Sequence, residues 1–420
     1  MSIDILGWEK VNLSDKKYFK IIGSGVNYFK GTKNYYSTSS VDGNKVLNPE
    51  GEFTYFNRPS RANMQPSNNT VWFAKMKNTL KVIKCSERFN ANSILSTGFS
   101  GIYSDKVLAE YLEQIFLSED FNVQKDNLSE GSTQQAINNS KLKDIYVDIP
   151  LNLNEQKKIA EILTKVDEAI ENTEQLIQKY EQVKVGLMQD LLTKGIDENG
   201  NIRSEETHQF KDSPLGRIPV EWEVKPLGEL IEAIDPQPDH RTPAEVLNGV
   251  PYIGISDVNT EGKIDFINSR KVGLNVLNKQ NKSFKIEQND IIFGKIGTIG
   301  RPTLLPHIKN LNYTLSANII LIQPKISKLF IYYILLSEYI ENQIQLSIHS
   351  TSQPAFGMNK IRSLEIKLPK ISSNEFDSIV KPLIKIDNKL NKEREILRKI
   401  KIQKQGLMQD LLSGKVRVNF

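Results

Sequence analysis

Apolar residues recur at alternating three- and four-residue steps in two long stretches of the chain. In the first stretch, which breaks only at Thr173, they are Ile159, Ile162, Val166, Ala169, Leu176, Tyr180, Val183 and Leu187. In the second, which Glu393 and Lys404 interrupt, they are Phe376, Ile379, Leu383, Ile386, Leu390, Leu397, Ile400 and Leu407. This spacing is typical of a coiled-coil seam. It predicts two long amphipathic helices, over residues 151–194 and within residues 370–420.

The two predicted helices carry opposite net charge. Over Asn154–Leu192 five lysines stand against eight acids, whereas Asn374–Leu412 holds nine basic residues against six acids. Opposite charges favour packing of the helices on each other rather than of each on a second copy of itself. Two unrelated surface helices are the alternative. Because a proline removes a helical hydrogen bond, we expect the second helix to bend at Pro382 or to begin regularly near it.

The chain also writes one order of features twice. The heptapeptide "GLMQDLL" stands at Gly186–Leu192 and again at Gly406–Leu412. Further back, "STQQ" is answered by "STSQ", and "WEKVNL" from Trp8 by "WEVKPL" from Trp222. A repeat that keeps its order over half the chain predicts two copies of one module, each followed by a helix.

Two pairs of glycines follow the same repeat. Gly195 and Gly414 lie just past the periodic stretches and are interpreted as helix C-terminal stops. Gly186 and Gly406 lie inside them, where glycine costs about 1 kcal/mol relative to alanine. Either a neighbouring backbone approaches closely there, or the helix frays.

The modules themselves predict an α+β fold with a mixed or antiparallel sheet. In residues 222–369 the runs "VPYIGISDV", "NDIIFGKIG" and "SANIILIQP" are typical of strands, and "SKLFIYYILLSEYIENQIQ" of a helix. "NTVWFAKMK", "KVIKCSE" and "KVLAEYLEQIFLSEDF" repeat this order in the first module. We expect a first module over 1–150, a helix over 151–194, a linker over 195–218, a second module over 219–369, and a second helix and tail over 370–420.

Composition excludes several classes of protein. The chain has 420 residues, of which 39% are hydrophobic and 25% charged, and no run of about 18 apolar residues. The single cysteine, Cys85, excludes an internal disulfide and a cysteine-rich zinc site. The N-terminus lacks the pattern of a signal peptide, so we expect a cytoplasmic protein. A formal net charge of +5 is compatible with a nucleic-acid partner but does not require one.

Catalytic patterns are not found in the sequence. "FGKIGTIGR" at Phe293–Arg301 lacks the spacing of a phosphate loop and is expected to form a tight strand-turn-strand. The four histidines are scattered, and "DPQPDHR" at Asp235–Arg241 has no Glu-x-Lys partner, which favours a proline-ordered loop over a nuclease site. The Asn/Asp-Pro-Pro-Tyr/Phe segment of an amino-methyltransferase is missing too.

Donor-rich loops are the remaining candidates for function. In the first module they hold Arg58, Arg61, Asn63, Lys75, Lys77, Lys81 and Lys84, next to Tyr55 and Phe56. In the second module the candidates are Lys295, Thr298 and Arg301. Arginine pairs with guanine and asparagine with adenine in the major groove, and lysine holds phosphates. DNA binding is therefore the hypothesis, with a solvated lysine-rich face as its alternative.

These features together resemble the specificity subunits of type I restriction–modification systems. The resemblance rests on "IPLNLNEQKKIAEIL", the two "GLMQDLL" ends, "DSPLGRIPVEWEVKPLGEL" and "STSQPAFGMNKIRSLEIKLP", and covers nearly the whole chain. It implies two target-recognition domains that each read one half of a split DNA sequence, and two antiparallel spacer helices related by a pseudo-twofold axis. It also implies no activity of the chain itself. The first module lacks the proline of "SQPAFGMNK", which is a departure from the pattern.

The resemblance further implies two adenine-methylating modification subunits and motor-nuclease restriction subunits as partners. S-adenosylmethionine, ATP and Mg would then belong to the partners, and the chain itself would need no cofactor. The repeated "GLMQDLL" predicts two like docking surfaces, exposed at Leu187, Met188, Leu191, Leu192, Leu407, Met408, Leu411 and Leu412. The alternative is that these side chains only close the coiled coil.

Two other classes of protein stay open at this point. A stand-alone DNA-binding regulator with a coiled-coil spacer would show no methyltransferase partner. An enzyme with an unrecognised active site would methylate DNA or hydrolyse ATP as the pure chain. The recognised bases do not follow from the sequence, because loop residues do not map one-to-one onto bases.

Overall fold

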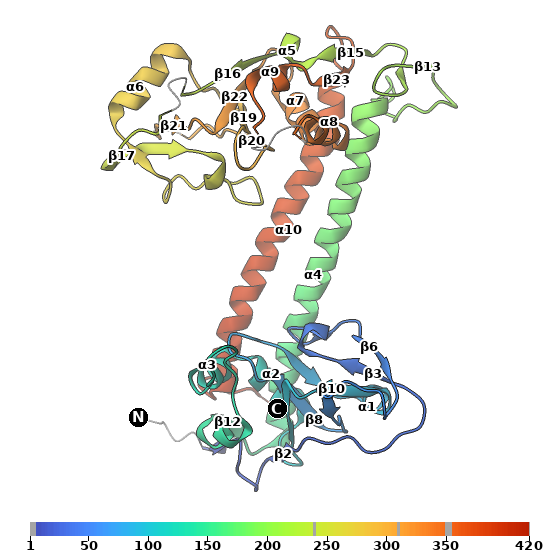
Figure 1. Ribbon diagram of the computed structural model, residues 1–420, viewed down its shortest axis with the longest axis vertical. Coiled ribbons are helices and arrows are strands. Elements are labelled where there is room, and N and C mark those ends of the chain that lie inside the picture. Colours follow the sequence, from blue (N-terminus) through green and yellow to red (C-terminus); the bar gives the residue numbers. More distant parts are fainter. Residues whose placement is uncertain (1–5, 238–240, 309–310, 349–354, 420) are drawn as a thin grey trace. The chain divides into compact units, whose positions relative to one another are not determined.

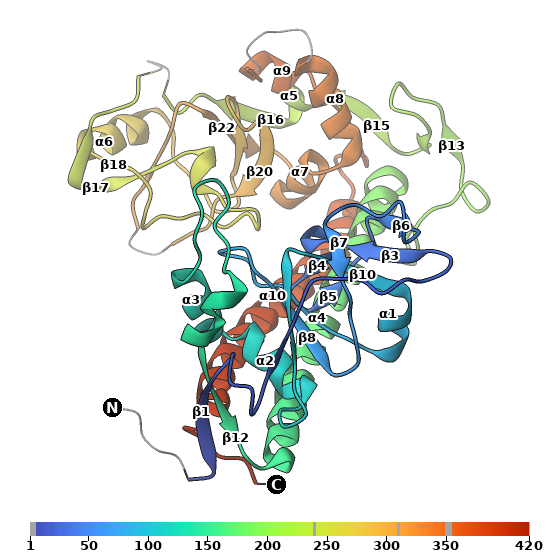
Figure 2. The same ribbon diagram turned by 60° about the horizontal axis from the view of Figure 1, so that its bottom comes forward.

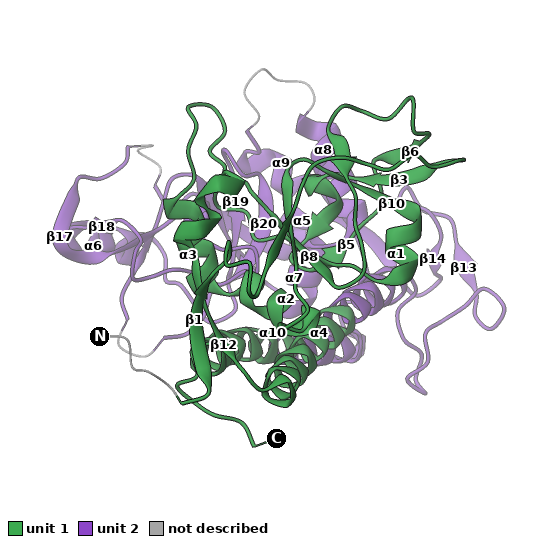
Figure 3. Cartoon of the chain, turned by 90° about the horizontal axis from the view of Figure 1, so that it is seen from below, with its two compact units in different colours: residues 1–176, 393–420 green, residues 177–392 purple. Residues whose placement is uncertain are grey.

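The computed structural model describes residues 6–237, 241–308, 311–348 and 355–419. The chain divides into two compact units, residues 1–176 with 393–420 (unit 1) and residues 177–392 (unit 2), shown in Figure 3. Each long helix begins in one unit and ends in the other. No helix among the described residues is both long and apolar enough to cross a membrane.

Unit 1 is built from small sheets covered by short helices. A mainly central sheet has the antiparallel order β2 (Lys20–Ile22), β11 (Phe99–Tyr103), β8 (Thr70–Ala74), β9 (Val82–Lys84). A second sheet has the order β6 (Gly51–Phe53), β3 (Lys33–Tyr36), β10 (Ser93–Ser96), β7 (Ala62–Met64), in which β3 and β10 are parallel. β1 (Trp8–Asn12) pairs with β12 (Tyr146–Pro150), and β4 (Val41–Asp42) with β5 (Lys45–Val46). The helices are α1 (Glu87–Asn92), α2 (Ala109–Leu117) and α3 (Glu119–Asn127), as Figure 2 shows.

Unit 2 repeats this plan with different loops. Its main sheet has the order β16 (Ile231–Ile234), β22 (Ile319–Pro324), β19 (Ile291–Gly294), β20 (Gly300–Leu304). A second sheet joins β18 (Lys271–Val272), β17 (Glu245–Ile253) and β21 (Thr314–Leu315), with β17 and β21 parallel. β15 (Glu223–Pro226) pairs with β23 (Glu365–Leu368), and β13 (Phe210–Lys211) with β14 (Ile218–Pro219). The helices are α5 (Leu227–Leu230), α6 (Leu274–Ser283), α7 (Lys328–Leu335), α8 (Glu338–Ile348) and α9 (Met358–Arg362).

The strand registers make the repeat exact at the level of single residues. In unit 1, Gly101 pairs with both Ile22 and Trp72, and in unit 2 Leu321 pairs with both Ile234 and Ile292. The three strands β2, β11 and β8 therefore correspond to β16, β22 and β19. The mixed α+β class and the tandem modules are confirmed.

One helix prediction was wrong in the same way in both modules. The run "SKLFIYYILLSEYIENQIQ" forms two helices, because α7 ends at Leu335 and α8 begins at Glu338. Its counterpart breaks at Ser118, between α2 and α3. Ser118 Oγ donates to the carbonyl of Ile115 at 2.7 Å, and Ser337 Oγ donates to that of Ile334 at 2.6 Å. A serine hydroxyl competes with the helical ladder for backbone groups, which ends the first helix at both places.

The two long helices are α4 (Leu153–Lys194) and α10 (Glu375–Leu412), which confirms the predicted pair (Figure 1). Pro382 lies inside α10, so the expectation that this helix begins near the proline was wrong. Gly195 and Gly414 have φ of 66° and 68°, which confirms both as left-handed helix stops. Val183, predicted on the seam, is 43% exposed, whereas Leu163 and Ile177 are buried.

Within each unit the helices run antiparallel. In unit 1, Lys404 Nζ lies 2.5 Å from Asp167 Oδ1, and Lys401 Nζ lies 2.8 Å from Glu174 Oε1. In unit 2, Lys184 Nζ lies 2.6 Å from Asp387 Oδ1. Lys184 and Lys404 are 220 positions apart, and so are Asp167 and Asp387. One lysine–aspartate pair is thus written twice, once for each unit.

Candidate nucleic-acid interface

Several predicted residues of unit 1 gather at one end of the main sheet. The amide of Thr97, in the turn before β11, donates to the carbonyl of Arg61 at 2.9 Å. The amide of Lys75, directly after β8, donates to the carbonyl of Gly98 in the same turn at 2.9 Å. Asn63 accepts from the amide of Gly25, which follows β2, at 2.8 Å. The structure therefore brings Arg61, Asn63 and Lys75 together at the level of the backbone.

The side chains at this end differ in what they offer. Arg61 is exposed. Arg58 is half-buried, donates to the carbonyls of Ala62 and Tyr55, and lies over the Tyr55 ring at 4.2 Å. Because its guanidinium is spent on its own loop, Arg58 organises that loop and is a poorer reader of bases than the sequence predicts.

The lysines of β8 and β9 separate into three environments. Lys77 is exposed, and its amide donates to Gln135 of the "STQQ" segment at 2.9 Å. Lys81 Nζ donates to the carbonyl of Thr38 at 2.7 Å. Lys84 lies at the other end of the hairpin, opposite Val71, with its Nζ 3.1 Å from Glu113 Oε2. The expectation that Lys84 joins the other lysines was therefore wrong.

In unit 2 the predicted strand-turn-strand is confirmed as the β19–β20 hairpin. A Cβ at Gly294 would collide with the carbonyl oxygen of Thr298, so the return of this loop requires glycine there. Thr298 is exposed, and Arg301 is half-buried with a left-handed φ of 55°. Lys295 is 12% exposed, and its Nζ lies 2.7 Å from Asp235 Oδ2. Lys295 is thus paired within the chain and is not the open cation that the sequence predicts.

Parts of two predicted loops lie outside the described residues. These are residues 238–240 of the "DPQPDHR" segment and residues 350–353, the "STSQ" segment. The described flank of the second segment is informative, because Ala355 bridges to Ile296 as Ala136 bridges to Met76 in unit 1. The loops after the two strand-end lysines are therefore held alike.

An aromatic cluster stands beside Arg58 in unit 1. Tyr55 packs edge-on against Tyr28 and Phe56, with centroids 5.4 Å apart in both pairs. Phe56 is 84% exposed and Tyr28 63% exposed. Large exposed rings are costly in water and suit a surface that stacks on a partner. The sequence predicted Tyr55 and Phe56 here but gave no signal for Tyr28.

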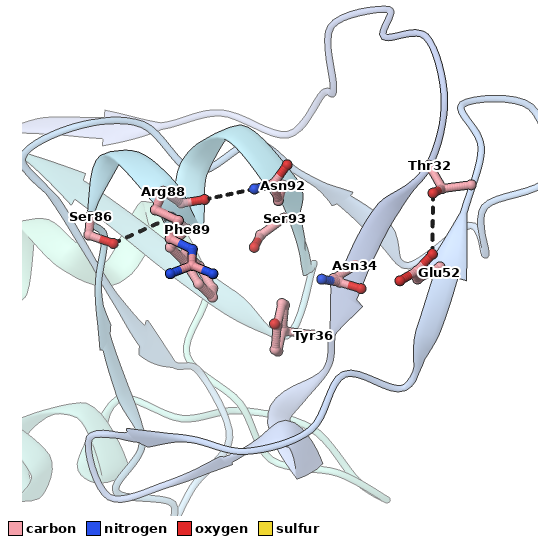
Figure 4. Close-up of a pocket in the computed structure, with 9 residues that line it drawn as sticks. All are labelled: Thr32, Asn34, Tyr36, Glu52, Ser86, Arg88, Phe89, Asn92 and Ser93. Carbon is pink, nitrogen blue, oxygen red and sulfur yellow. Dashed lines mark hydrogen bonds between the residues drawn. The ribbon is translucent and has the colours of Figure 1, made fainter.

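Unit 1 also contains a polar cavity of about 510 Å³. Figure 4 shows that it lies between β3, β6 and α1, and that it is lined by Thr32, Asn34, Tyr36, Glu52, Ser86, Arg88, Phe89, Asn92 and Ser93. None of the predicted DNA-binding residues lines it. Among the described residues, no group of three or more His, Cys, Asp or Glu side chains is placed to hold a metal ion.

The repeated heptapeptide is mostly buried, which corrects the expectation of two exposed leucine surfaces. Leu191 and Leu192 belong to the core of unit 2, and Met408, Leu411 and Leu412 to that of unit 1. Leu187, Met188 and Leu407 are partly buried against the same cores. These side chains hold the helix ends on their modules, because each apolar face that meets a core is removed from water.

What the heptapeptide leaves exposed is polar and flat. Gly186, Gln189, Gly406 and Gln409 are exposed. A Cβ at either glycine would have nothing within 4 Å, so no neighbour within the described residues approaches the helix there. The close approach considered from the sequence is therefore not made by the chain itself.

The structure also shows a polar clamp, written twice, that sequence reasoning missed. In unit 2, both guanidinium nitrogens of Arg203 bond the carboxylate of Glu375, at the start of α10, and Trp222 Nε1 lies 3.3 Å from the same group. In unit 1, Arg417 bonds Glu155, near the start of α4, at 2.5 Å and 2.8 Å, and lies over the Trp8 ring. Trp8 and Trp222 are the repeated tryptophans. The segment after each helix thus locks the beginning of the other.

The fold and its contacts define a class: two copies of an α+β module, each joined to a copy of one long helix, with basic loops at the same end of each sheet. Residues 7–182 and 219–401 both match the family described as "Type I restriction modification DNA specificity domain". The chain belongs to this family.

Relatives and solved structures agree with that membership. The chain is 29% identical over 286 residues to the type I restriction enzyme MjaVIII specificity subunit of Methanocaldococcus jannaschii, which covers 65% of this chain and 63% of the relative. The putative MjaX specificity subunit of the same organism is 28% identical over 304 residues, or 71% and 65% of the two chains. The matches thus span slightly less than two thirds of these relatives. The crystal structure of an S subunit from M. genitalium has the same fold, with a TM-score of 0.59 at 16% identity over 98% and 97% of the chains.

Proposed function

We propose that the chain is the DNA sequence-specificity subunit of a type I restriction–modification enzyme. It binds a bipartite target, one half-site per module, and recruits adenine-methylating modification subunits and restriction subunits. It has no catalytic role, and S-adenosylmethionine, ATP and Mg belong to the partners. The observation that carries the proposal is the repeat: two modules of one fold present different side chains at corresponding sheet ends, as two different half-sites require. Family membership supports the same function.

Substitutions in one module should change recognition of one half-site only. Arg61→Ala removes an exposed guanidinium in unit 1, and Thr298→Ala an exposed hydroxyl in unit 2. Loss of a base contact costs about 1–3 kcal/mol at that position, whereas loss of a phosphate contact weakens all sequences alike. Sequencing of methylated adenines in cells that express the chain with its modification partner should show one relaxed half-site per variant.

The matched control is Arg88→Ala, which removes another exposed arginine of unit 1, at the cavity and away from the sheet end. It should leave the methylated sequence unchanged. Equal changes in both half-sites for Arg61→Ala would contradict the division of labour between modules.

Recruitment of the modification subunits should depend on the exposed part of the heptapeptide. Gly186→Arg and Gly406→Arg together place long cations where the chain has open space. The exchange should stabilise each helix, because glycine is a poorer helix former than arginine by roughly 0.5–1 kcal/mol. We expect a higher melting temperature together with loss of co-purification with the modification subunit. A complex of unchanged stoichiometry would show that partners dock elsewhere, and Gly186→Ala with Gly406→Ala controls for propensity alone.

A further inference from the structure

The two modules carry a lysine at the same residue of the repeat, but only one of these lysines has an acid beside it. Lys75 follows β8 and Lys295 follows β19, each three residues past a paired position, Trp72 or Ile292. The backbone around them is held identically. The amide of Lys75 donates to Gly98 and its carbonyl accepts from Ile137, both at 2.9 Å, and Lys295 makes the same bonds to Asn318 at 2.8 Å and Phe356 at 2.9 Å.

The neighbouring strand decides what each lysine meets. β2 and β16 occupy the same place, with Ile22 corresponding to Ile234, so the next residue is Gly23 in unit 1 and Asp235 in unit 2. Asp235 forms the 2.7 Å ion pair with Lys295. At Gly23 there is no side chain, and within the described part of the chain Lys75 forms no ion pair.

Charge and burial give this difference a physical meaning. Lys75 is half-buried, and burial lowers the pKa of its ammonium group because the charged form loses solvation. An anion brought to this group would restore the lost interaction. Lys295 already has such an anion, and a DNA phosphate approaching it would also meet the carboxylate of Asp235.

We propose that the residue one past the end of β2 or β16 decides whether the strand-end lysine binds DNA. With Gly23, Lys75 contacts a backbone phosphate of the first half-site; with Asp235, Lys295 is held inside the module and makes no phosphate contact. This proposal rests on the proposed function. It makes the two modules electrostatically unequal despite their common fold, so that ionic strength weakens the grip of the first module more than that of the second at this position.

The salt dependence of DNA binding measures this directly. Each phosphate contact contributes roughly 0.9 to the slope of log K against log salt concentration on double-stranded DNA. The full chain in complex with its modification partner is titrated against a duplex carrying its methylated sequence. Lys75→Gln should lower the slope by about 1, and Lys295→Gln should leave it unchanged.

Exchange of the neighbouring residue should move the property between modules. Gly23→Asp places a carboxylate in open space at a position without positive φ, and should lower the slope by about 1. Asp235→Asn should raise it by about 1, and Asp235→Asn with Lys295→Gln should restore the original slope, because the gain needs the lysine. Glu232→Gln, an exposed acid three residues earlier on β16, makes the same change in net charge and should have no such effect.

The outcomes separate this proposal from the proposed function. If the unaltered complex methylates a bipartite sequence and yet Lys295→Gln lowers the slope as much as Lys75→Gln, or Gly23→Asp leaves it unchanged, the assignment to Gly23 and Asp235 is overturned. If the unaltered complex neither methylates nor binds a bipartite sequence, the proposed function fails first. Melting curves of each variant show that the module stays folded.

Discussion

Replacement of Glu375 by alanine is expected to destabilise unit 2 by about 3 kcal/mol. Its carboxylate accepts from the guanidinium of Arg203, from the Trp222 indole and, at 2.9 Å, from the amide of Ile196. The side chains of Arg203 and Glu375 are only 11% and 12% exposed. Removing one partner of a buried pair leaves a buried charge uncompensated, which costs about 3–5 kcal/mol. Denaturant unfolding of the full chain, followed by the fluorescence of Trp222, measures the loss.

Asp377→Asn is the matched control, since this acid lies in the same first turn of α10 but is exposed. It should cost well under 1 kcal/mol, because surface charges contribute little. A loss as small for Glu375→Ala would show that the clamp does not hold unit 2. The copy in unit 1 offers a second trial: Glu155 is 1% exposed, but Arg417 is 42% exposed, so Glu155→Ala should cost somewhat less.

The clamps show what the sequence could not supply. Arg203 and Glu375 are 172 positions apart, and Arg417 and Glu155 are 262 apart, so no local spacing links them. Each glutamate stands early in a helix, where an acid is common because it complements the helix dipole. A signal did exist in the repeat itself, since Trp8 and Trp222 mark the two modules and each ends up beside a clamp.

Features with a local cause were predictable. The three- and four-residue steps predicted both long helices, and Gly195 and Gly414 end them in the left-handed conformation that favours glycine. The tight return after Phe293 predicted the β19–β20 hairpin. Strand runs and repeated motifs were enough for the class of fold, because alternation and turn residues act over a few positions.

Exposure was the part that pattern alone misjudged. The heptapeptide has the same letters whether its leucines face a partner or the chain's own module, and the structure buries five of its apolar side chains. Lys295 looks like an open cation until Asp235, 60 positions earlier, is placed beside it. Which of two polar groups is free depends on long-range pairing, and a single sequence does not contain that information.

The unit boundary indicates where the length of the two helices can be changed without disturbing either module. α4 passes from unit 1 to unit 2 between Leu176 and Ile177, and α10 passes back between Lys392 and Glu393. The pair Lys404–Asp167 lies wholly on one side of this boundary, and Lys184–Asp387 wholly on the other. An equal insertion in both helices at the boundary therefore leaves every one of these contacts intact.

Insertion of seven residues at both places should lengthen the gap between the two methylated half-sites while the bases within each half-site stay the same. A heptad keeps the seam in phase and adds about 10.5 Å of helix, at roughly 1.5 Å per residue. Duplex DNA rises about 3.4 Å per base pair, so translation alone corresponds to a gap longer by about three base pairs. Insertion in α4 alone is the control: it takes Lys184 and Asp167 out of register with their partners on α10, and methylation should be lost. The measurement is methylation-site sequencing of both variants beside the unaltered chain. An unchanged gap with full activity in the doubly lengthened variant, or altered bases within a half-site, would show that these helices do not set the distance between the recognised sequences.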